Sequence, residues 1–356
     1  MKITTSDVRI DSIVTLQSPA ELFAELPLSE EQADAITTTR CRIADIIHGR
    51  DPRLLIVVGP CSIHDPLAAM EYANRLHSLR TRYRDTLEIV MRVYFEKPRT
   101  IIGWKGLIND PHMDNSFQID EGLYKARRLL LDLADIGMPA GCEFLDAATG
   151  QYYADTVSWG AIGARTTESQ VHREIASGLS CPVGFKNATS GDVGIAIDAI
   201  QAAGHAHAFL SPTSEGRIAL FRTTGNEDAH LILRGGNTPN YDGASVKAAF
   251  DQQNARGLSR RIMIDCSHAN SLKDHRRQVA VASDVAGRLD REHPMIAGLM
   301  IESHLCEGKQ GMKDPSSLRY GQSITDACLG WDDTRHTLDG LAQAMSGIVS
   351  QAALPG

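Results

Sequence analysis

The chain has 356 residues, of which 42% are hydrophobic and 22% are charged. This composition is ordinary for a folded soluble protein and unlike that of a disordered or collagen-like chain. Because 36 basic residues face 44 acidic ones, the net charge is −8, and no broad surface for nucleic acid or anionic lipid is expected. Seven cysteines without a CxxC pair are typical of reduced thiols, and no apolar run approaches the ~20 residues of a membrane span. We therefore expect a cytoplasmic protein that does not act at a membrane.

Residues 1–50 differ in pattern from the rest of the chain and are expected to form an appendage. Residues 8–14 alternate in the manner of a short strand. The pair Ser18-Pro19 indicates the start of a helix, and Ser29 with Gln32 forms a capping box that predicts a second helix.

Residues 51–356 alternate short apolar runs with amphipathic stretches, which predicts parallel strands joined by helices. Eight runs lie at 54–59, 87–94, 140–144, 160–164, 183–186, 231–233, 261–265 and 296–301. They predict an α/β fold of the (β/α)8 TIM barrel type. An open doubly wound sheet is the alternative, although no GxGxxG follows the first run. An inserted β-hairpin is expected at about 206–224, where two short runs flank a turn-rich loop.

Basic side chains follow several of these runs, at the end of a barrel where active sites lie. They are Arg92, Lys97, Arg99, Arg165, Lys186 and Arg234, and Glu143 ends another run. Closely spaced cations repel one another unless anions offset them. The cluster therefore predicts two phosphorylated ligands, or one ligand with two anionic groups. The alternative for each residue is an ordinary solvated position in a loop.

Four potential metal ligands follow the first, seventh and eighth runs, which become neighbours when a barrel closes. They are Cys61, His268, Glu302 and Asp326. A thiolate, an imidazole and two carboxylates suit one divalent ion such as Mn²⁺, Fe²⁺, Co²⁺ or Zn²⁺ better than Ca²⁺ or Mg²⁺. A buried cysteine and a core histidine are the alternative. Nearby Cys328 is either inert packing or a thiol that could oxidise with Cys61 when the metal is lost.

Six longer motifs cover these same positions. They are GPCSIHD at 59–65, RVYFEKPRT at 92–100, GARTTES at 163–169, GFKN at 184–187, LRGG at 233–236 and DCSH at 265–268. Together they resemble the class I 3-deoxy-D-arabino-heptulosonate 7-phosphate (DAHP) synthases, and the likeness covers nearly the whole chain. Ala188 departs from that family, which usually has glycine after Lys-Asn, and is expected to be tolerated unless the position needs a positive φ.

The resemblance implies that phosphoenolpyruvate, D-erythrose 4-phosphate and water give DAHP and phosphate, the first step of the shikimate route to aromatic amino acids. It also implies which residues bind phosphoenolpyruvate: Arg92, Lys97, Glu143, Arg165, Lys186 and Arg234. Erythrose 4-phosphate would be bound by Lys97, Arg99 and Thr100. The catalytic groups would be Lys97, His268 and Glu143, with the proton donor to the aldehyde undecided between Lys97 and His268.

The appendage and the hairpin resemble the feedback-regulated branch of the family. The resemblance then implies that residues 1–50 have a regulatory or oligomerisation role, in a homo-oligomer that is a dimer or a tetramer. An aromatic amino acid would bind near Asp146, Gly150, Gln151, Leu179, Ser180, Phe209 and Ser211. Phenylalanine-sensitive members carry proline at the position of Gly150, so the smaller residue favours tryptophan as effector and tyrosine second. The alternative is that these residues only pack the outer end of the barrel.

Three other functions compete with this interpretation. A 3-deoxy-D-manno-octulosonate 8-phosphate synthase has the same chemistry, but it resembles Lys-Ala-Asn-Arg where this chain has Lys-Pro-Arg-Thr at 97–100. A metal-dependent aldolase of sugar phosphates would not need so many cations. A non-catalytic sensor of aromatic amino acids would not need every predicted ligand and basic residue.

Overall fold

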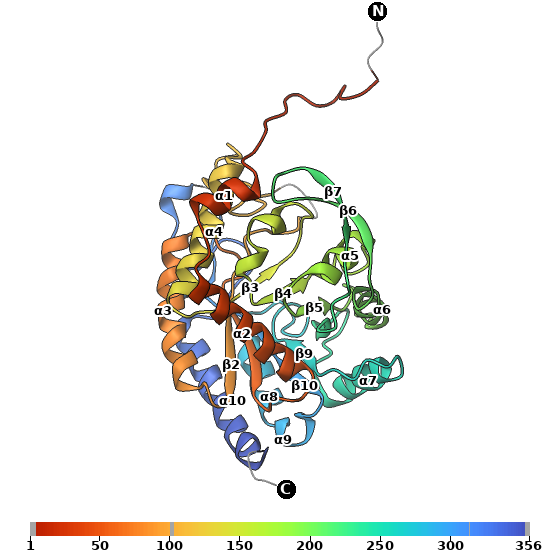
Figure 1. Ribbon diagram of the computed structural model, residues 1–356. Helices are drawn as coiled ribbons and strands as arrows, with labels where there is room; N and C mark the ends of the chain where they lie inside the picture. Colours follow the sequence, from red (N-terminus) through yellow and green to blue (C-terminus); the bar gives the residue numbers. More distant parts are fainter. Residues whose placement is uncertain (1–4, 100–102, 313, 353–356) are drawn as a thin grey trace, which may run out of the picture.

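The computed structural model describes residues 5–99, 103–312 and 314–352, and its centre is a closed barrel of parallel strands (Figure 1). The strand order around the barrel is β1-β10-β9-β8-β5-β4-β3-β2, which confirms the predicted (β/α)8 architecture. The strands are β1 Leu54–Gly59, β2 Leu87–Arg92, β3 Ala140–Glu143, β4 Trp159–Ile162, β5 Val183–Lys186, β8 His230–Leu233, β9 Ile262–Asp265 and β10 Ile296–Glu302. Nearly every strand residue is buried, because helices cover the outside of the barrel and side chains fill its interior.

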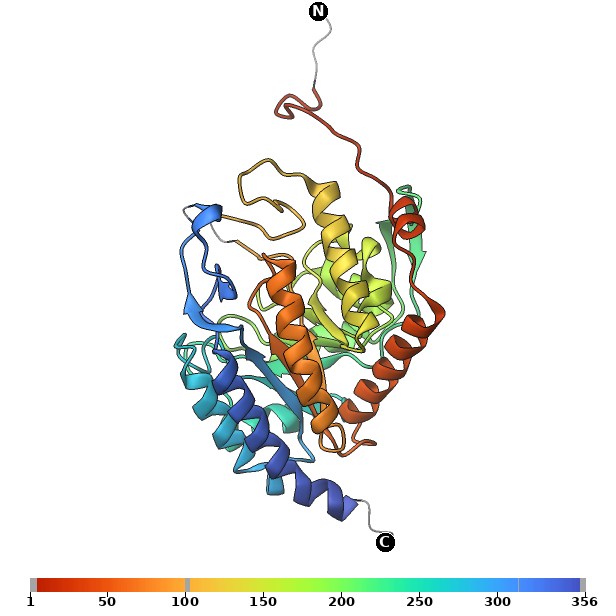
Figure 2. The same ribbon diagram turned by 90° about the vertical axis from the view of Figure 1, so that its left-hand side faces the viewer.

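The helices surround this barrel, as Figures 1 and 2 show. They are α1 Pro19–Glu25, α2 Glu30–Ile47, α3 Pro66–Arg82, α4 Ile119–Asp135, α5 Gln170–Gly178, α6 Gly194–Ala203, α7 Gly243–Asn254, α8 Arg277–Ala286, α9 Leu289–Glu292 and α10 Trp331–Ala352. Short 3₁₀ turns are η1 Thr149–Tyr152, η2 Ala154–Thr156 and η3 Pro315–Ser317. The predicted capping box of Ser29 with Gln32 is present, and the predicted helix start at Ser18 also forms a capping box, with Glu21. None of the helices in the described ranges is long and apolar enough to cross a membrane.

Helix α2 belongs to the barrel core although it lies within the first 50 residues. Its residues Ile43, Ile46 and Ile47 are fully buried and pack in one cluster with interior residues of the barrel strands. The backbone N–H of Arg261, just before β9, donates to the carbonyl of Ile47 over 2.9 Å. Helix α2 therefore closes the end of the barrel at which the strands begin.

The prediction of a strand at residues 8–14 is wrong for the described chain. This segment has no regular structure and extends away from the barrel (Figure 2). Val8 is 69% exposed and Ile13 is 80% exposed. A strand is stable only when its backbone groups pair with another strand, and the described residues offer this segment no such partner.

The inserted hairpin forms between α6 and β8, from β6 (Ala208–Pro212) and β7 (Ile218–Arg222). The two strands pair antiparallel with Phe209 opposite Phe221, while Leu210 and Leu220 remain exposed. A second small sheet, not expected from the sequence, pairs β11 (Cys306–Lys309) with β12 (Gln322–Ser323). It lies in the loop after β10 and leads the chain to Asp326.

Candidate active site

A cavity of about 180 Å³ opens at the end of the barrel where the strands terminate. Its lining includes every basic residue of the predicted cluster: Arg92, Lys97, Arg99, Arg165, Lys186 and Arg234. Glu143, His268 and Asp326 line the same cavity. The strands are parallel, so residues that are far apart in sequence meet at one mouth. Thr100, predicted to bind a sugar phosphate, lies outside the described residues. Leu145, Thr166 and Thr189 also line the cavity and were not singled out from the sequence.

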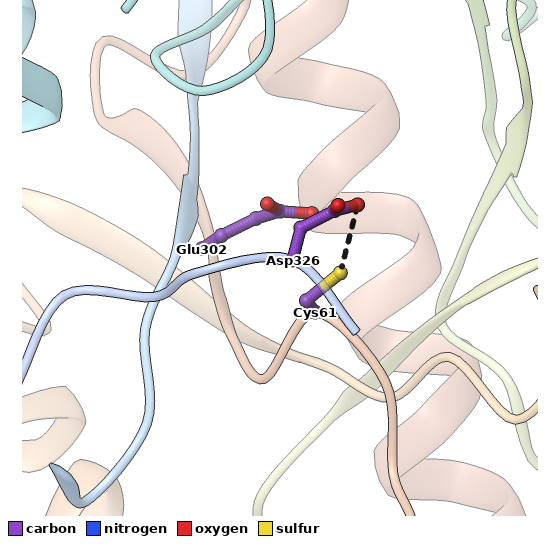
Figure 3. Close-up of side chains that lie close together, drawn as sticks. All are labelled: Cys61, Glu302 and Asp326. Atoms are coloured by element: carbon purple, nitrogen blue, oxygen red, sulfur yellow. Dashed lines mark hydrogen bonds between the residues drawn. The ribbon is translucent and has the colours of Figure 1, made fainter. Parts of the chain in front are cut away.

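Three predicted metal ligands lie together beside this cavity. Ligand atoms of Cys61, Glu302 and Asp326 are within 4.8 Å of one another (Figure 3). The Cys61 Sγ lies 3.5 Å from Asp326 Oδ2, and Glu302 is buried beside them. A thiol and two carboxylates form a donor set that fits a divalent ion. This cluster could hold a metal ion.

Cys61 reaches the cluster because a glycine precedes it by two positions. A Cβ on Gly59 would lie 2.6 Å from the carbonyl oxygen of Arg92, so only glycine lets the end of β1 approach β2 this closely. Burial, and next the Glu302 carboxylate, raise the pKa of the Cys61 thiol. A metal ion must therefore displace the thiol proton when it binds. Cys328 is buried beside it and accepts a hydrogen bond from the Cys61 N–H over 3.4 Å, while its oxidation with Cys61 stays a prediction.

His268 lies outside this group of three but lines the same cavity. Its Nδ1 is 2.9 Å from Oδ2 of Asp265. Its backbone has a φ of 55°, a left-handed conformation that is uncommon for a residue with a side chain and is often found at functional sites. With Nδ1 directed to Asp265, Nε2 is the ring nitrogen left to act in the cavity.

Asp265 is the functional residue that the sequence analysis quoted within a motif but gave no role. Its carboxylate is fully buried at the end of β9, and Oδ2 lies 2.9 Å from both Lys186 Nζ and His268 Nδ1. Burial alone would raise the pKa of Asp265, but Lys186 and His268 hold it well below its ordinary value. The ionised carboxylate therefore fixes both side chains. An aspartate ending an apolar run was the available signal.

Arg92 lines the cavity and also contacts two of the proposed metal ligands. Its Nη2 lies 3.0 Å from Glu302 Oε1, and its Nη1 donates to the Cys61 carbonyl over 2.6 Å. The guanidinium also lies 3.7 Å from the centre of the Tyr94 ring. Lys97 Nζ is 3.1 Å from Cys61 Sγ. Two cations thus border the cluster and offset two of the three negative charges that a thiolate and two carboxylates carry.

A buried carboxylate near the cavity should make stability depend on pH. Burial raises the pKa of Glu96 to about 7, although Thr149 Oγ1 donates to it over 3.0 Å. The raised pKa means that stability is greatest below the pKa of the unfolded chain and is lost as pH rises through 7, by about 3 kcal/mol. We expect Glu96→Gln to remove most of this change between pH 5 and pH 8 in urea unfolding. The exposed Glu31→Gln variant should keep it, and equal slopes for Glu96→Gln and wild type would contradict the prediction.

A larger cavity of about 620 Å³ lies between η1, α5 and the hairpin. All the residues predicted to contact an effector line it: Asp146, Gly150, Gln151, Leu179, Ser180, Phe209 and Ser211. Phe23, Phe144 and Phe221 add aromatic walls. The space beside Gly150 is narrow, since a Cβ there would lie 3.2 Å from Phe144 Cδ1. The cavity is large and aromatic enough for an amino acid with a ring side chain.

Ala188, the departure from the family motif, does not have a positive φ and is buried. An alanine there is accommodated without backbone strain.

A cationic cavity beside a thiol–carboxylate cluster, at the end of a closed barrel where its strands terminate, defines an enzyme of the (β/α)8 class. The family model of the DAHP synthetase I family matches residues 25–339. The chain is 56% identical to the Phe-sensitive phospho-2-dehydro-3-deoxyheptonate aldolase of Escherichia coli (strain K12), covering 97% of this chain and 99% of that one. The chain belongs to the DAHP synthetase I family.

Other relatives agree on the family but not on a regulatory branch. The Trp-sensitive enzyme of Enterobacter agglomerans is 54% identical over 96% of this chain and 98% of its own. The structure of phospho-2-dehydro-3-deoxyheptonate aldolase from Francisella tularensis SCHU S4 superposes with a TM-score of 0.93 at 48% identity, covering 94% of this chain and 98% of that one. Identities to Phe-sensitive and Trp-sensitive enzymes are too similar to separate the two branches.

Proposed function

We propose that the protein condenses phosphoenolpyruvate with D-erythrose 4-phosphate and water, giving DAHP and phosphate. The observation that carries the proposal is the gathering of the basic cluster and the thiol–carboxylate cluster at one cavity. Full-length similarity to enzymes named phospho-2-dehydro-3-deoxyheptonate aldolase supports the same reaction. Two phosphorylated substrates account for cations that would otherwise repel one another.

The positions of the basic residues support the assignment of different residues to each of the two substrates. Arg165 and Arg234 line the cavity and bind the phosphate of phosphoenolpyruvate, and Lys186, fixed by Asp265, faces its carboxylate. Arg92 joins them from the side of Glu302. Arg99, with Thr100, binds erythrose 4-phosphate. Guanidinium groups suit the phosphates because each can donate two parallel hydrogen bonds.

One divalent ion, Mn²⁺, Fe²⁺, Co²⁺ or Zn²⁺, completes the site in this proposal. Cys61, Glu302 and Asp326 would hold it, joined by His268 through Nε2. When bound, it polarises the aldehyde oxygen as a Lewis acid. The Asp265 carboxylate keeps the His268 ring oriented toward this position.

The reaction forms one carbon–carbon bond and replaces the carbon–oxygen bond to the phosphate with a carbon–oxygen bond to the water oxygen. The methylene carbon of phosphoenolpyruvate attacks the aldehyde carbon, and Lys97 or His268 delivers a proton to the aldehyde oxygen. Water adds to the cationic carbon left behind, oriented by Glu143, which lines the cavity. The resulting phosphate hemiketal collapses and releases inorganic phosphate. Arg165 and Arg234 stabilise the charge that develops on the departing phosphate.

A single assay tests the reaction and its rivals. Phosphate release from phosphoenolpyruvate is measured with erythrose 4-phosphate, with arabinose 5-phosphate or with no sugar, each with and without a chelator. We expect release with erythrose 4-phosphate alone, lost with chelator and restored by added divalent metal. Release only with arabinose 5-phosphate would favour the octulosonate synthase, and no release with either sugar would contradict the proposal.

We assign the 620 Å³ cavity to feedback inhibition by an aromatic amino acid, with tryptophan favoured and tyrosine second. Its volume and its aromatic walls support an indole ring. Inhibition by tryptophan, tyrosine and phenylalanine is compared in the wild type and in Gly150→Pro. We expect tryptophan to inhibit most strongly and Gly150→Pro to weaken it about tenfold, since roughly 1.4 kcal/mol of lost contact suffices. The absence of inhibition by tryptophan in the wild-type enzyme would contradict the assignment.

The exposed N-terminal arm and hairpin support a homo-oligomer, dimer or tetramer. Val8, Ile13 and Val14 on the arm and Leu210 and Ile218 on the hairpin leave apolar side chains without cover in a single described chain. Such surfaces typically mark contacts between subunits. The cytoplasmic location stays a prediction.

A further inference from the structure

Strand β10 continues beyond the end of its neighbour β9. The last paired residues are Met300 on β10 and Asp265 on β9, whereas β10 ends at Glu302. After Asp265 the chain bends into the turn that contains His268. The Cys266 N–H still donates to the Met300 carbonyl over 2.8 Å, so the backbone of Met300 faces β9. Alternate residues of a strand direct their backbone groups to the same neighbour. The N–H and C=O of Glu302 therefore also point toward β9, past the end of that strand.

The side chain of Gln278 takes the place of the missing strand residue. Gln278 is the second residue of α8 and is fully buried. Its Oε1 accepts from the Glu302 N–H over 2.8 Å, and its Nε2 donates to the Glu302 carbonyl over 3.0 Å. A buried backbone group without a partner is costly, so nearly all of them are paired in folded proteins. One side-chain amide thus satisfies both backbone groups of Glu302.

The Glu302 carbonyl also binds the segment that carries another proposed metal ligand. It accepts a second hydrogen bond from the Leu329 N–H over 2.9 Å. Leu329 follows Asp326 by three residues, and its own carbonyl accepts from the His304 N–H over 2.9 Å. Gln278 and Leu329 therefore share one acceptor atom, which joins α8, the end of β10 and the segment after Asp326.

We propose that Gln278 is a positioning residue for Glu302, holding it where its carboxylate can bind the same divalent ion as Cys61 and Asp326. Arg92 Nη2 lies 3.0 Å from the carboxylate, so the side chain and the backbone of Glu302 are fixed by different partners. Gln278 does not line the candidate active-site cavity and acts through Glu302. This inference rests on the metal binding proposed above. Residues that orient a metal ligand typically change metal affinity 10–100-fold when they are replaced.

Gln253 on α7 provides a matched control. It is also a buried glutamine on a helix of the barrel, and its Nε2 donates to the carbonyl of Arg260. Arg260 precedes β9, so this contact lies at the end of the barrel where the strands begin, away from the proposed metal ligands. Methionine in place of either glutamine keeps a long unbranched side chain and removes the amide. Both changes should therefore destabilise the fold, because each leaves buried backbone groups without a side-chain partner.

Metal binding distinguishes the two variants. Full-length protein is freed of metal with a chelator and titrated with Mn²⁺ by calorimetry, and Co²⁺ binding is followed by the absorption spectrum of the bound ion. We expect Gln278→Met to bind Mn²⁺ about 10–100-fold more weakly than the wild type and to change the Co²⁺ spectrum, which reports ligand geometry. Gln253→Met should lower the melting temperature but keep the wild-type Mn²⁺ affinity and Co²⁺ spectrum.

Two further variants test the paired hydrogen bonds of Gln278. Gln278→Asn is shorter by one methylene group and cannot reach both backbone groups of Glu302, so it should weaken Mn²⁺ binding at least about tenfold. In Gln278→Glu, burial favours the neutral carboxylic acid, which can accept from the N–H and donate to the carbonyl. At about pH 6 this variant should bind Mn²⁺ within about threefold of the wild type. The contrast between these two variants also tests the proposal if Gln278→Met does not fold.

Several results would overturn this role for Gln278. They are wild-type Mn²⁺ affinity in Gln278→Met or Gln278→Asn, equal losses in Gln253→Met, and a loss in Gln278→Glu as large as that in Gln278→Asn. If the wild type releases phosphate with added metal while the Gln278 variants bind metal normally, only the role of Gln278 is wrong. A wild type that binds no divalent ion would contradict the proposed metal site and this inference together.

Discussion

The Lys97→Ala variant should lose at least about 10³-fold in turnover while still binding one equivalent of metal. Lys97 Nζ lies 3.1 Å from Cys61 Sγ and lines the cavity, but it cannot ligate a cation while protonated. Loss of a proton donor alone typically costs 10²–10⁴ in rate, and we also assign this side chain to the binding of both substrates. The measurements are the initial rate of phosphate release and the metal content after dialysis.

Lys105→Ala provides the matched control for Lys97. It lies in the same loop and is exposed, and only its backbone carbonyl contacts Lys97, by accepting from the Lys97 N–H over 2.8 Å. Its removal should leave turnover and metal content near wild type. If Lys97→Ala kept more than about a tenth of the activity, the role assigned to this residue in proton transfer would be wrong. If it lost its metal, Lys97 would instead act by stabilising the thiolate.

The Cys61→Ala variant should lose metal binding and turnover together. The thiol is fully buried within 4.8 Å of carboxylate oxygens from Glu302 and Asp326, and it is the only sulfur among the ligands proposed here. Even residues that only orient a ligand cost 10–100-fold in metal affinity when removed, so we expect a loss of at least about 10²-fold for the ligand itself. Metal titration by calorimetry and activity in excess metal measure the two effects.

Cys306→Ala controls for the loss of a cysteine elsewhere. Its thiol is half-buried on β11 and is not part of the cluster. This variant should keep wild-type metal affinity. Unchanged metal affinity in Cys61→Ala would show that the thiol is not a ligand and that only oxygen and nitrogen atoms bind the metal.

Because metal binding displaces the Cys61 proton, the wild-type affinity should also rise with pH, and that dependence should weaken in Cys61→Ala.

The sequence was sufficient to predict helix starts and strand positions, because capping residues and apolar runs act within a single segment. Ser18 and Ser29 cap helices where predicted, and the apolar runs became the barrel strands with ends displaced by at most two residues. The segment at 8–14 was the exception, because its alternation describes a surface that needs a partner strand. Apolar periodicity states which face of a segment is buried, but not what covers it.

The candidate site was predicted as a set of residues and not as a network of contacts. Parallel strands bring their ends to one mouth, so the order of polar residues along the chain was enough to predict that Arg165, Arg234 and Asp326 meet. The pairing of Asp265 with Lys186 and His268 was not foreseeable, since it depends on the stagger of neighbouring strands. The ion pair between Arg92 and Glu302 was not foreseeable for the same reason.

The sequence by itself determined the class of fold, the family and the chemical types gathered at the mouth of the barrel. These follow from periodicity, from capping residues and from motifs that lie within single segments. Only the tertiary structure decided that α2 closes the far end of the barrel and that Asp265 pairs with both Lys186 and His268. Such contacts join residues distant in sequence, and their distances are set by how whole elements pack rather than by neighbours along the chain.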